Sequence, residues 1–121
     1  MSIHRLKVAD AEQLRIDGKT STQILCPGNA PDAQITITRV VMEPGAISPQ
    51  HSHPRSEQTW IVESGSATLL LADGKTAPME RGDVLRTPIG EVHGIENTGV
   101  ERFVYLTITA PPEDMSPHYA T

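Results

Sequence analysis

Three of the five histidines have spacings that suit the binding of one metal ion. His51 and His53 are two residues apart, so on a β-strand their side chains point to the same face of the sheet. A third imidazole from His93 and a nearby oxygen donor would complete a mixed nitrogen and oxygen ligand set. Such a set suits Fe, Mn, Zn, Ni or Cu better than Mg or Ca. Taken alone, the segment from His51 to Pro54 also fits an exposed loop that binds no metal.

Short apolar segments separated by turn residues make up most of the chain that must position these histidines. Ten prolines and nine glycines are spread along the sequence and interrupt the apolar runs at short intervals. Asp73-Gly74 is a dipeptide typical of a tight hairpin turn. The predicted strands are 35–42, 59–63, 67–72, 76–79, 84–87, 91–96 and 102–109, with a helical stretch expected only at 8–14. Many strands without helices between them predict an all-β, antiparallel sandwich or barrel.

Length and charge restrict the classes of function. The chain has 121 residues, which predicts a single domain over 1–121. Its net charge is −5, and an acidic chain without basic clusters is a poor candidate for binding nucleic acid. No apolar run suits a membrane-spanning helix and no apolar signal region follows Met1, so we expect a cytoplasmic protein. Cys26 is the single cysteine, which excludes an intramolecular disulfide and a multi-cysteine zinc site.

The spacing around the histidines is far more specific than the histidines alone. Residues 45–65 follow the pattern G-x5-H-x-H-x4-Q-x6-G, and residues 82–97 follow G-x5-P-x-G-x2-H-x3-N. These patterns resemble the two motifs of the cupin superfamily. The 16 residues between them are similar to the short spacer of single-domain bacterial cupins. The second motif matches at every defined position, whereas the first has Gln58 where most cupins have glutamate.

The resemblance implies a fold and a set of metal ligands. The implied fold is a small antiparallel double-stranded β-helix, the jelly-roll barrel of cupins, with one divalent transition-metal ion inside. The motif glycines would lie at turns between strands, where a positive φ or a close backbone approach is needed. Asn97 would have a structural role, through hydrogen bonds to the backbone near the following turn. Carried over by position, the metal ligands are His51, His53, Gln58 and His93.

Glu57, next to Gln58, is the alternative fourth ligand. Strand alternation places Gln58 on the same face as Trp60 and Val62, and Glu57 on the opposite face. The face with Trp60 and Val62 resembles a barrel interior, and Gln58 also leaves the six-residue gap that the first motif has before its last glycine. Both arguments favour Gln58. The same alternation puts Ile61 on the outer face, where a second buried interface would be needed to cover it.

The ligand set indicates a class of chemistry. Three neutral imidazoles and a neutral amide would leave the full charge on a divalent ion, which favours Lewis-acid chemistry on a carbonyl or an anionic substrate. We therefore expect a mononuclear metal-binding protein that acts on a small polar organic molecule. The reaction would be isomerase-like or lyase-like, or a dioxygenation. The alternative is a non-catalytic small-molecule-binding module, because a fold alone does not fix a function.

The remaining expectations concern the ends of the chain and its assembly. Residues 111–121 are predicted to form a polar tail, because a segment that opens with two prolines cannot continue a sheet. His4 and His118 are expected to lie at the surface without a chemical role. A small barrel exposes strand edges, so we expect a homodimer, with Ile3–Val8 and Gln23–Cys26 as the contact segments.

Overall fold

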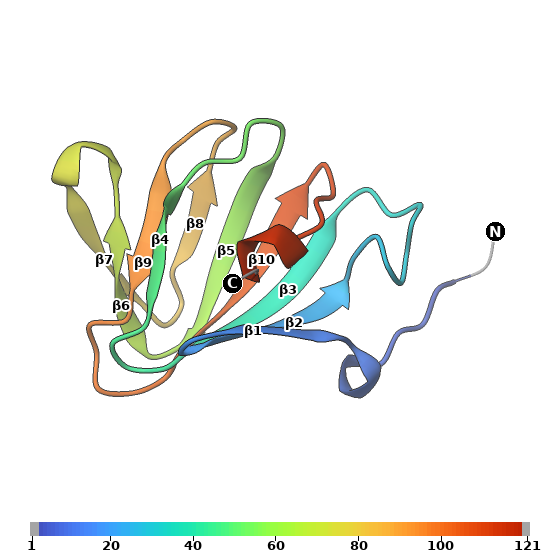
Figure 1. The fold of residues 1–121 in the computed structure, drawn as a ribbon, viewed down its shortest axis with the longest axis horizontal. Coiled ribbons are helices and arrows are strands. Elements are labelled where there is room, and N and C mark those ends of the chain that lie inside the picture. Colours follow the sequence, from blue (N-terminus) through green and yellow to red (C-terminus); the bar gives the residue numbers. More distant parts are fainter. Residues whose placement is uncertain (1–2, 120–121) are drawn as a thin grey trace.

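The chain folds into ten β-strands and three short 3₁₀ turns, as a computed structural model that describes residues 3–119 shows (Figure 1). The strands are β1 (Gln13–Ile16), β2 (Lys19–Leu25), β3 (Thr36–Met42), β4 (Ile47–His51), β5 (Glu57–Ser64), β6 (Ser66–Leu70), β7 (Thr76–Glu80), β8 (Val84–Thr87), β9 (His93–Glu96) and β10 (Phe103–Ala110). The 3₁₀ turns are Val8–Asp10, Ala72–Gly74 and Ser116–Tyr119. Residues 120 and 121 of the predicted tail lie outside the described residues.

The strands form two antiparallel sheets that pack face to face. The six-stranded sheet has the order β1-β2-β3-β10-β5-β8, and the four-stranded sheet has the order β4-β9-β6-β7. Neighbouring strands are often far apart in the chain, as where β10 lies between β3 and β5. This wrapped order, with both sheets contributing to one core, is the double-stranded β-helix that the sequence predicts.

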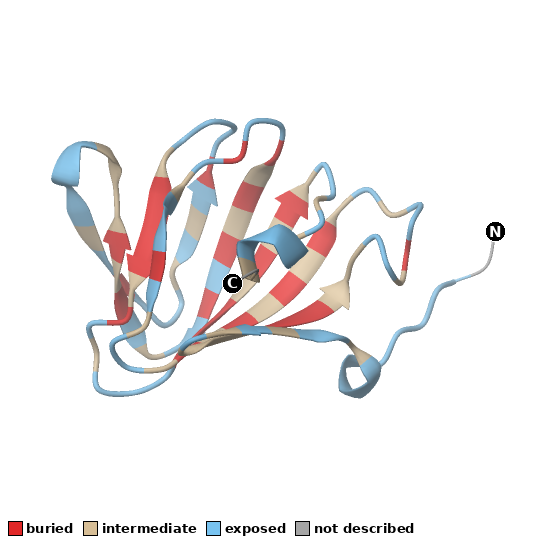
Figure 2. Ribbon diagram, viewed as in Figure 1, coloured by how far each residue is buried: buried red, intermediate tan, exposed pale blue. Residues whose placement is uncertain are grey.

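The interior is apolar at one end and polar at the other. Buried and less buried residues alternate along β3, β5 and β10, which places every second side chain inside (Figure 2). The apolar core is formed by Val40, Met42, Trp60, Val62, Ala67, Leu69, Met79, Ile95, Phe103 and Tyr105. Towards the other end of the same strands, buried Thr36 pairs with Thr109 and buried Thr38 pairs with Thr107. Their hydroxyls create a polar zone inside the barrel, and the histidines lie at this end.

The predicted turn residues have the backbone geometry for which they were singled out. Gly65, between β5 and β6, has φ +79°, and a Cβ at this position would overlap the carbonyl oxygen of Arg102. Asp73 and Gly74 both have positive φ in the turn between β6 and β7, which confirms the expected hairpin. The Nδ2 of Asn97 donates to the backbone carbonyls of Met42 and Glu101, so its predicted structural role is confirmed.

One expectation about local structure is wrong. The predicted helix at 8–14 is replaced by a single 3₁₀ turn at Val8–Asp10, because the chain from Gln13 onward pairs with β2 as an edge strand. Gln23–Cys26, predicted as a contact segment, is covered at its start: β1 pairs with residues 19–22 of the same strand, and the Gln23 N–H donates to the Glu12 carbonyl. The residues from Ile3 to Val8 are exposed in the single chain.

The sequence-based strands left out β4, which carries His51. This strand contains Pro49, a residue that disfavours sheet interiors but is tolerated at an edge. β4 is an edge strand of the four-stranded sheet and pairs on one side with β9. Among residues 3–119, no helix is long and apolar enough to cross a membrane.

Candidate metal centre

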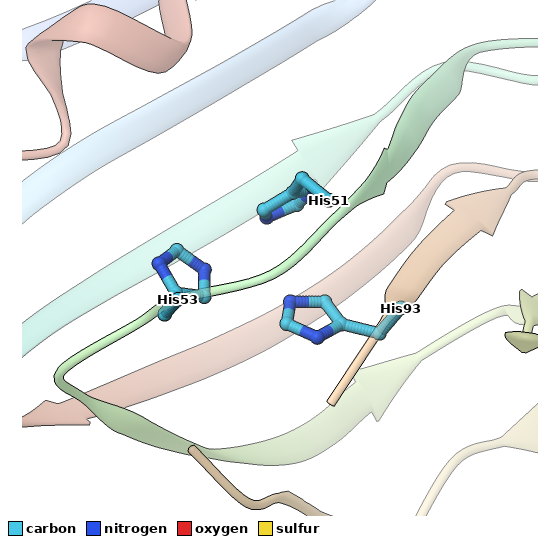
Figure 3. Close-up of side chains that lie close together, drawn as sticks. All are labelled: His51, His53 and His93. Carbon is cyan, nitrogen blue, oxygen red and sulfur yellow. The ribbon is translucent and has the colours of Figure 1, made fainter. Parts of the chain in front are cut away.

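Three imidazoles meet at the polar end of the barrel (Figure 3). His51 ends β4 and is the cross-strand partner of His93, which begins β9. Their ring centroids are 4.6 Å apart, and the ring of His53 lies 4.9 Å from His51 and 5.3 Å from His93. One nitrogen of each ring lies within 4.8 Å of the others, so the three can contact a single ion.

His53 reaches the cluster from a loop. β4 ends at His51, so the expected alternation along one strand positions only the first of the two histidines. The loop is held by the N–H of Gly90, which donates to the carbonyl of His53 at 2.9 Å. Gly90 belongs to the turn before β9, and this contact therefore joins the first motif to the second.

The Nδ1 atoms of two of the imidazoles, His51 and His93, already have a hydrogen-bond partner. Nδ1 of His51 donates to the carbonyl of Pro49 at 2.8 Å, and Nδ1 of His93 donates to the carbonyl of Glu91 at 3.0 Å. A carbonyl oxygen only accepts, so these two bonds place the proton on Nδ1 and leave the Nε2 lone pair free.

The Nε2 atoms of His53 and His93 are the unpartnered polar atoms of this cluster. Both are buried and have no hydrogen-bond partner among residues 3–119. Leaving a buried polar atom without a partner costs about 1–3 kcal/mol, so two such atoms side by side indicate that a ligand binds them. A metal ion bound by Nε2, with Nδ1 held by an oxygen, is the usual arrangement of ligating histidines. The residues present therefore fit a metal ion.

Burial keeps the imidazoles neutral. It lowers the pKa of His53 and of His93 to about 4, and the neighbouring imidazole of His51 adds to the effect in both. Burial also lowers the pKa of His51. A neutral imidazole is the form that binds metal, so near pH 7 no proton has to be displaced from the ligand atoms.

Gln58 faces the interior and Glu57 faces solvent. The Gln58 side chain is 3% exposed, its Oε1 accepts the indole N–H of Trp60 at 3.1 Å, and its Nε2 donates to the hydroxyl of Thr109 at 3.1 Å. The Glu57 carboxylate lies on the outer face, 2.6 Å from Nε of Arg86. The strand alternation argued from the sequence is therefore the alternation in the structure.

A family model of the cupin domain matches residues 38–109, a segment that includes His51, His53 and His93. The chain is a cupin. Its curated relatives include gentisate 1,2-dioxygenase from Ralstonia sp. (34% identical over 80 residues) and oxalate decarboxylase OxdC from Bacillus subtilis (37% identical over 78 residues). The matches cover 66% and 61% of this cupin but only 22% and 20% of those relatives.

The fold of this cupin recurs in solved structures. A protein with a double-stranded β-helix domain from Klebsiella pneumoniae superposes with a TM-score of 0.75 at 23% identity, covering 93% of each chain. At this identity the likeness concerns the fold. The names of the curated relatives include both a dioxygenase and a decarboxylase, so membership of the family leaves the reaction open.

A cavity of about 570 Å³ opens beside the imidazoles of this cupin. His51, His93 and Gln58 line it together with the aromatic rings of Trp60 and Tyr105. Its volume lies in the range of sites for small organic molecules. The mixture of apolar walls and a few polar groups can orient a small ligand against the metal centre.

Lys19 brings a positive charge into this cavity. Its Nζ donates to the hydroxyl of Ser48 at 3.1 Å and lies 4.9 Å from the ring centroid of Tyr119. Burial lowers the pKa of Lys19 to about 8, so the amine is still mostly protonated at pH 7. Within residues 3–119, no carboxylate forms an ion pair with it.

Two residues of the C-terminal segment (residues 111–119) approach the imidazoles, and the sequence had indicated neither. Oε2 of Glu113 lies 2.7 Å from Nδ1 of His53. The ring of His118 lies 5.3 Å from that of His51 and 5.4 Å from that of His53. His118 is exposed, as expected, but its ring lies beside the other imidazoles. No pattern in the sequence of residues 111–119 predicts this position. His4 is exposed.

Proposed function

We propose that this cupin holds one divalent transition-metal ion, with His51, His53 and His93 as ligands and Gln58 as a neutral oxygen donor. The unpartnered, buried Nε2 atoms of His53 and His93 carry the proposal. Gln58 lines the same cavity, and its Oε1 has a second lone pair beyond the one that accepts the Trp60 N–H. The nitrogen and oxygen donor set suits Fe, Mn, Zn, Ni or Cu.

The electrostatics of the site favour an anionic or carbonyl-bearing ligand. All four proposed metal ligands are neutral, so a bound ion would keep its full charge and act as a Lewis acid towards an oxygen of the ligand, or would bind dioxygen. The ammonium of Lys19 adds a positive charge in the same cavity. The buried rings of Trp60 and Tyr105 give this cavity apolar walls.

We infer that the substrate is a small organic acid and that the reaction is isomerase-like, lyase-like or a dioxygenation. The ammonium of Lys19 supports the substrate class, since the other charged lining residue, Asp17, is exposed to solvent. The names of two curated relatives contain oxalate and gentisate, both of which are carboxylates. A non-catalytic protein that binds the same class of ligand is the second candidate, because Glu113, the carboxylate that lies with the histidines among residues 3–119, is already in contact with His53.

The substrate class is tested with metal-loaded protein and matched pairs of ligands. Oxalate and gentisate are compared with their uncharged esters, binding being followed by calorimetry and conversion by NMR and oxygen uptake. We expect the acids to bind and the esters to bind at least tenfold more weakly. Conversion of an acid would establish an enzyme, whereas binding without conversion would favour the binding module. Equal affinity for acids and esters would contradict the anionic substrate class.

We further propose that the cupin is a homodimer. Ile3, Leu6 and Val8 are exposed apolar side chains near the N-terminus, and Ile61 and Val84 are exposed on the outer face of the six-stranded sheet. Apolar surface of this kind is commonly covered by a partner, and a second copy of the chain is the simplest one. Light scattering tests this proposal directly.

A further inference from the structure

We propose that the C-terminal segment is a working part of the metal centre, in which Glu113 orients His53 and His118 supplies a fourth imidazole. The proposal rests on the proposed metal binding and extends it to residues outside both cupin motifs. Glu113 and His118 lie more than 50 residues after His53 in the chain, yet a carboxylate oxygen of Glu113, a ring nitrogen of His118 and a ring nitrogen of His53 all lie within 4.8 Å of one another.

The contact of Glu113 with His53 is the first observation. Oε2 of Glu113 lies 2.7 Å from Nδ1 of His53, whose side chain is 2% exposed. The same Oε2 atom is buried and makes no hydrogen bond among residues 3–119, so its short contact with Nδ1 is a close charge contact and lacks the geometry of a hydrogen bond. A carboxylate beside Nδ1 fixes the orientation and the tautomer of a ligating imidazole and makes Nε2 a better donor. Glu113 is therefore a positioning residue that acts through His53.

The contact between Glu113 and His53 also changes the net charge around the proposed metal ion. His51 and His93 have backbone carbonyls as Nδ1 partners, so His53 alone of the three has a charged one. The first motif has Gln58 where most members of the family have glutamate, and the barrel wall therefore offers no negative charge to the ion. The Glu113 carboxylate, which belongs to the C-terminal segment and not to a strand of the barrel, supplies one negative charge next to the metal ligand His53.

His118 is exposed and lies beside the rings of His51 and His53. Its ring centroid lies 5.3 Å from that of His51 and 5.4 Å from that of His53, distances close to those within the triad itself. His118, Met115 and Tyr119 all line the cavity, so the 3₁₀ turn Ser116–Tyr119 forms part of its wall. Figure 1 shows this turn folded back towards the strands.

The segment is held in place at several points, which distinguishes it from a solvated tail. The hydroxyl of Ser56 donates to the carbonyl of Pro111 at 2.8 Å, which fixes the beginning of the segment. Oδ1 of Asp114 accepts from the N–H and the hydroxyl of Ser116, which sets up the 3₁₀ turn. At the far end, the ring of Tyr119 packs under the ammonium of Lys19.

The test measures metal affinity, with the metal-free fold as a separate readout. Glu113→Gln keeps the size of the side chain and removes its charge, and His118→Ala removes the imidazole. The matched controls are Glu80→Gln on β7 and His4→Ala, both at exposed positions whose side chains make no hydrogen bond, ion pair or ring contact to the cluster among the described residues. Affinity for Co²⁺ is measured by competition with a chelator, the visible spectrum of the Co²⁺ protein reports its ligand field, and thermal unfolding of the metal-free variants reports their fold.

We expect Glu113→Gln to weaken Co²⁺ binding by about 10–100-fold, the usual effect of removing a partner of a ligating histidine. His118→Ala should weaken binding by a similar factor and change the Co²⁺ spectrum, while both controls stay at the wild-type affinity. Metal-free unfolding midpoints near that of the wild type would show that the losses arise at the centre.

Wild-type affinity and spectrum in both variants would overturn the inference and leave the proposed metal centre standing. A loss in Glu113→Gln alone would overturn the ligand role of His118. If the wild-type protein itself bound no metal, the proposed function would fail together with this inference.

Discussion

The substitution Gln58→Glu tests whether residue 58 is a ligand of the proposed metal ion. In the structure, the Gln58 amide is buried between the indole N–H of Trp60 and the hydroxyl of Thr109. A glutamate fits the same space, because one oxygen still accepts from Trp60 and the Thr109 hydroxyl can turn to donate to the other. The substitution therefore changes the charge of the site with little change in shape.

The two consequences have opposite signs. In the metal-free protein the new carboxylate is buried without a countercharge, which lowers the free energy of unfolding by about 1–3 kcal/mol. With a metal ion bound, attraction between unit charges about 4 Å apart at an effective dielectric constant near 20 is about 4 kcal/mol. The folding cost is present in the metal-free and the metal-bound protein alike, so it does not reduce metal affinity. Because each 1.4 kcal/mol is tenfold, an attraction of this size should raise metal affinity by about tenfold or more.

Glu57→Gln is the matched control at the neighbouring position. It removes an exposed ion pair with Arg86, which is worth about 0–1 kcal/mol, and leaves the metal centre unchanged. Chelator competition measures metal affinity for both variants, and urea unfolding of the metal-free proteins measures stability. An unchanged affinity in Gln58→Glu together with a loss in Glu57→Gln would refute the reasoning and make Glu57 the ligand.

The cavity, a turn and the exposed apolar side chains give further predictions. Lys19→Met should weaken oxalate binding. In the wild type, oxalate affinity should fall above about pH 8, where the ammonium of Lys19 loses its proton, and the variant should lack this fall. Calorimetry below and above that pH measures both effects. Gly65→Ala and Gly82→Ala each place a side chain at positive φ at a cost of about 1–2 kcal/mol, but only Gly65→Ala adds an overlap with a backbone carbonyl. Equal denaturation midpoints for the two variants would count against that overlap. Light scattering at micromolar concentration should give the mass of a dimer, and a monomer would contradict the proposed assembly.

Much of the fold could be predicted because its determinants are local. The alternation of β3, the Asp73-Gly74 turn and the limits of β8 follow from residues that are adjacent in the sequence. β1 and β4 could not be recognised in this way. β1 is a short, mostly exposed edge strand, and β4 contains a proline that only its edge position allows. Their strand character comes from pairing with partners elsewhere in the chain.

The residues of the site also differ in whether local sequence patterns could predict them. That His51, His53 and His93 meet could be predicted, because each lies at a fixed number of residues from glycines that form turns. The alternation of side chains along a strand placed Gln58 inside and Glu57 outside. Glu113 and His118 follow a segment whose prolines and charges fit a solvated tail equally well. Only the tertiary packing of that segment against β1 and the cavity reveals their place.

The central claim, that His51, His53 and His93 form a metal centre, is tested most directly by the metal content of the protein. Untagged protein purified without chelator is compared by elemental analysis with the His51→Ala/His53→Ala double variant, and both are then reconstituted with Fe²⁺, Mn²⁺ and Zn²⁺. We predict near-stoichiometric metal in the wild type and none in the variant, with similar folds by circular dichroism. Equal metal content in the two proteins, or none in the wild type after reconstitution, would contradict the claim.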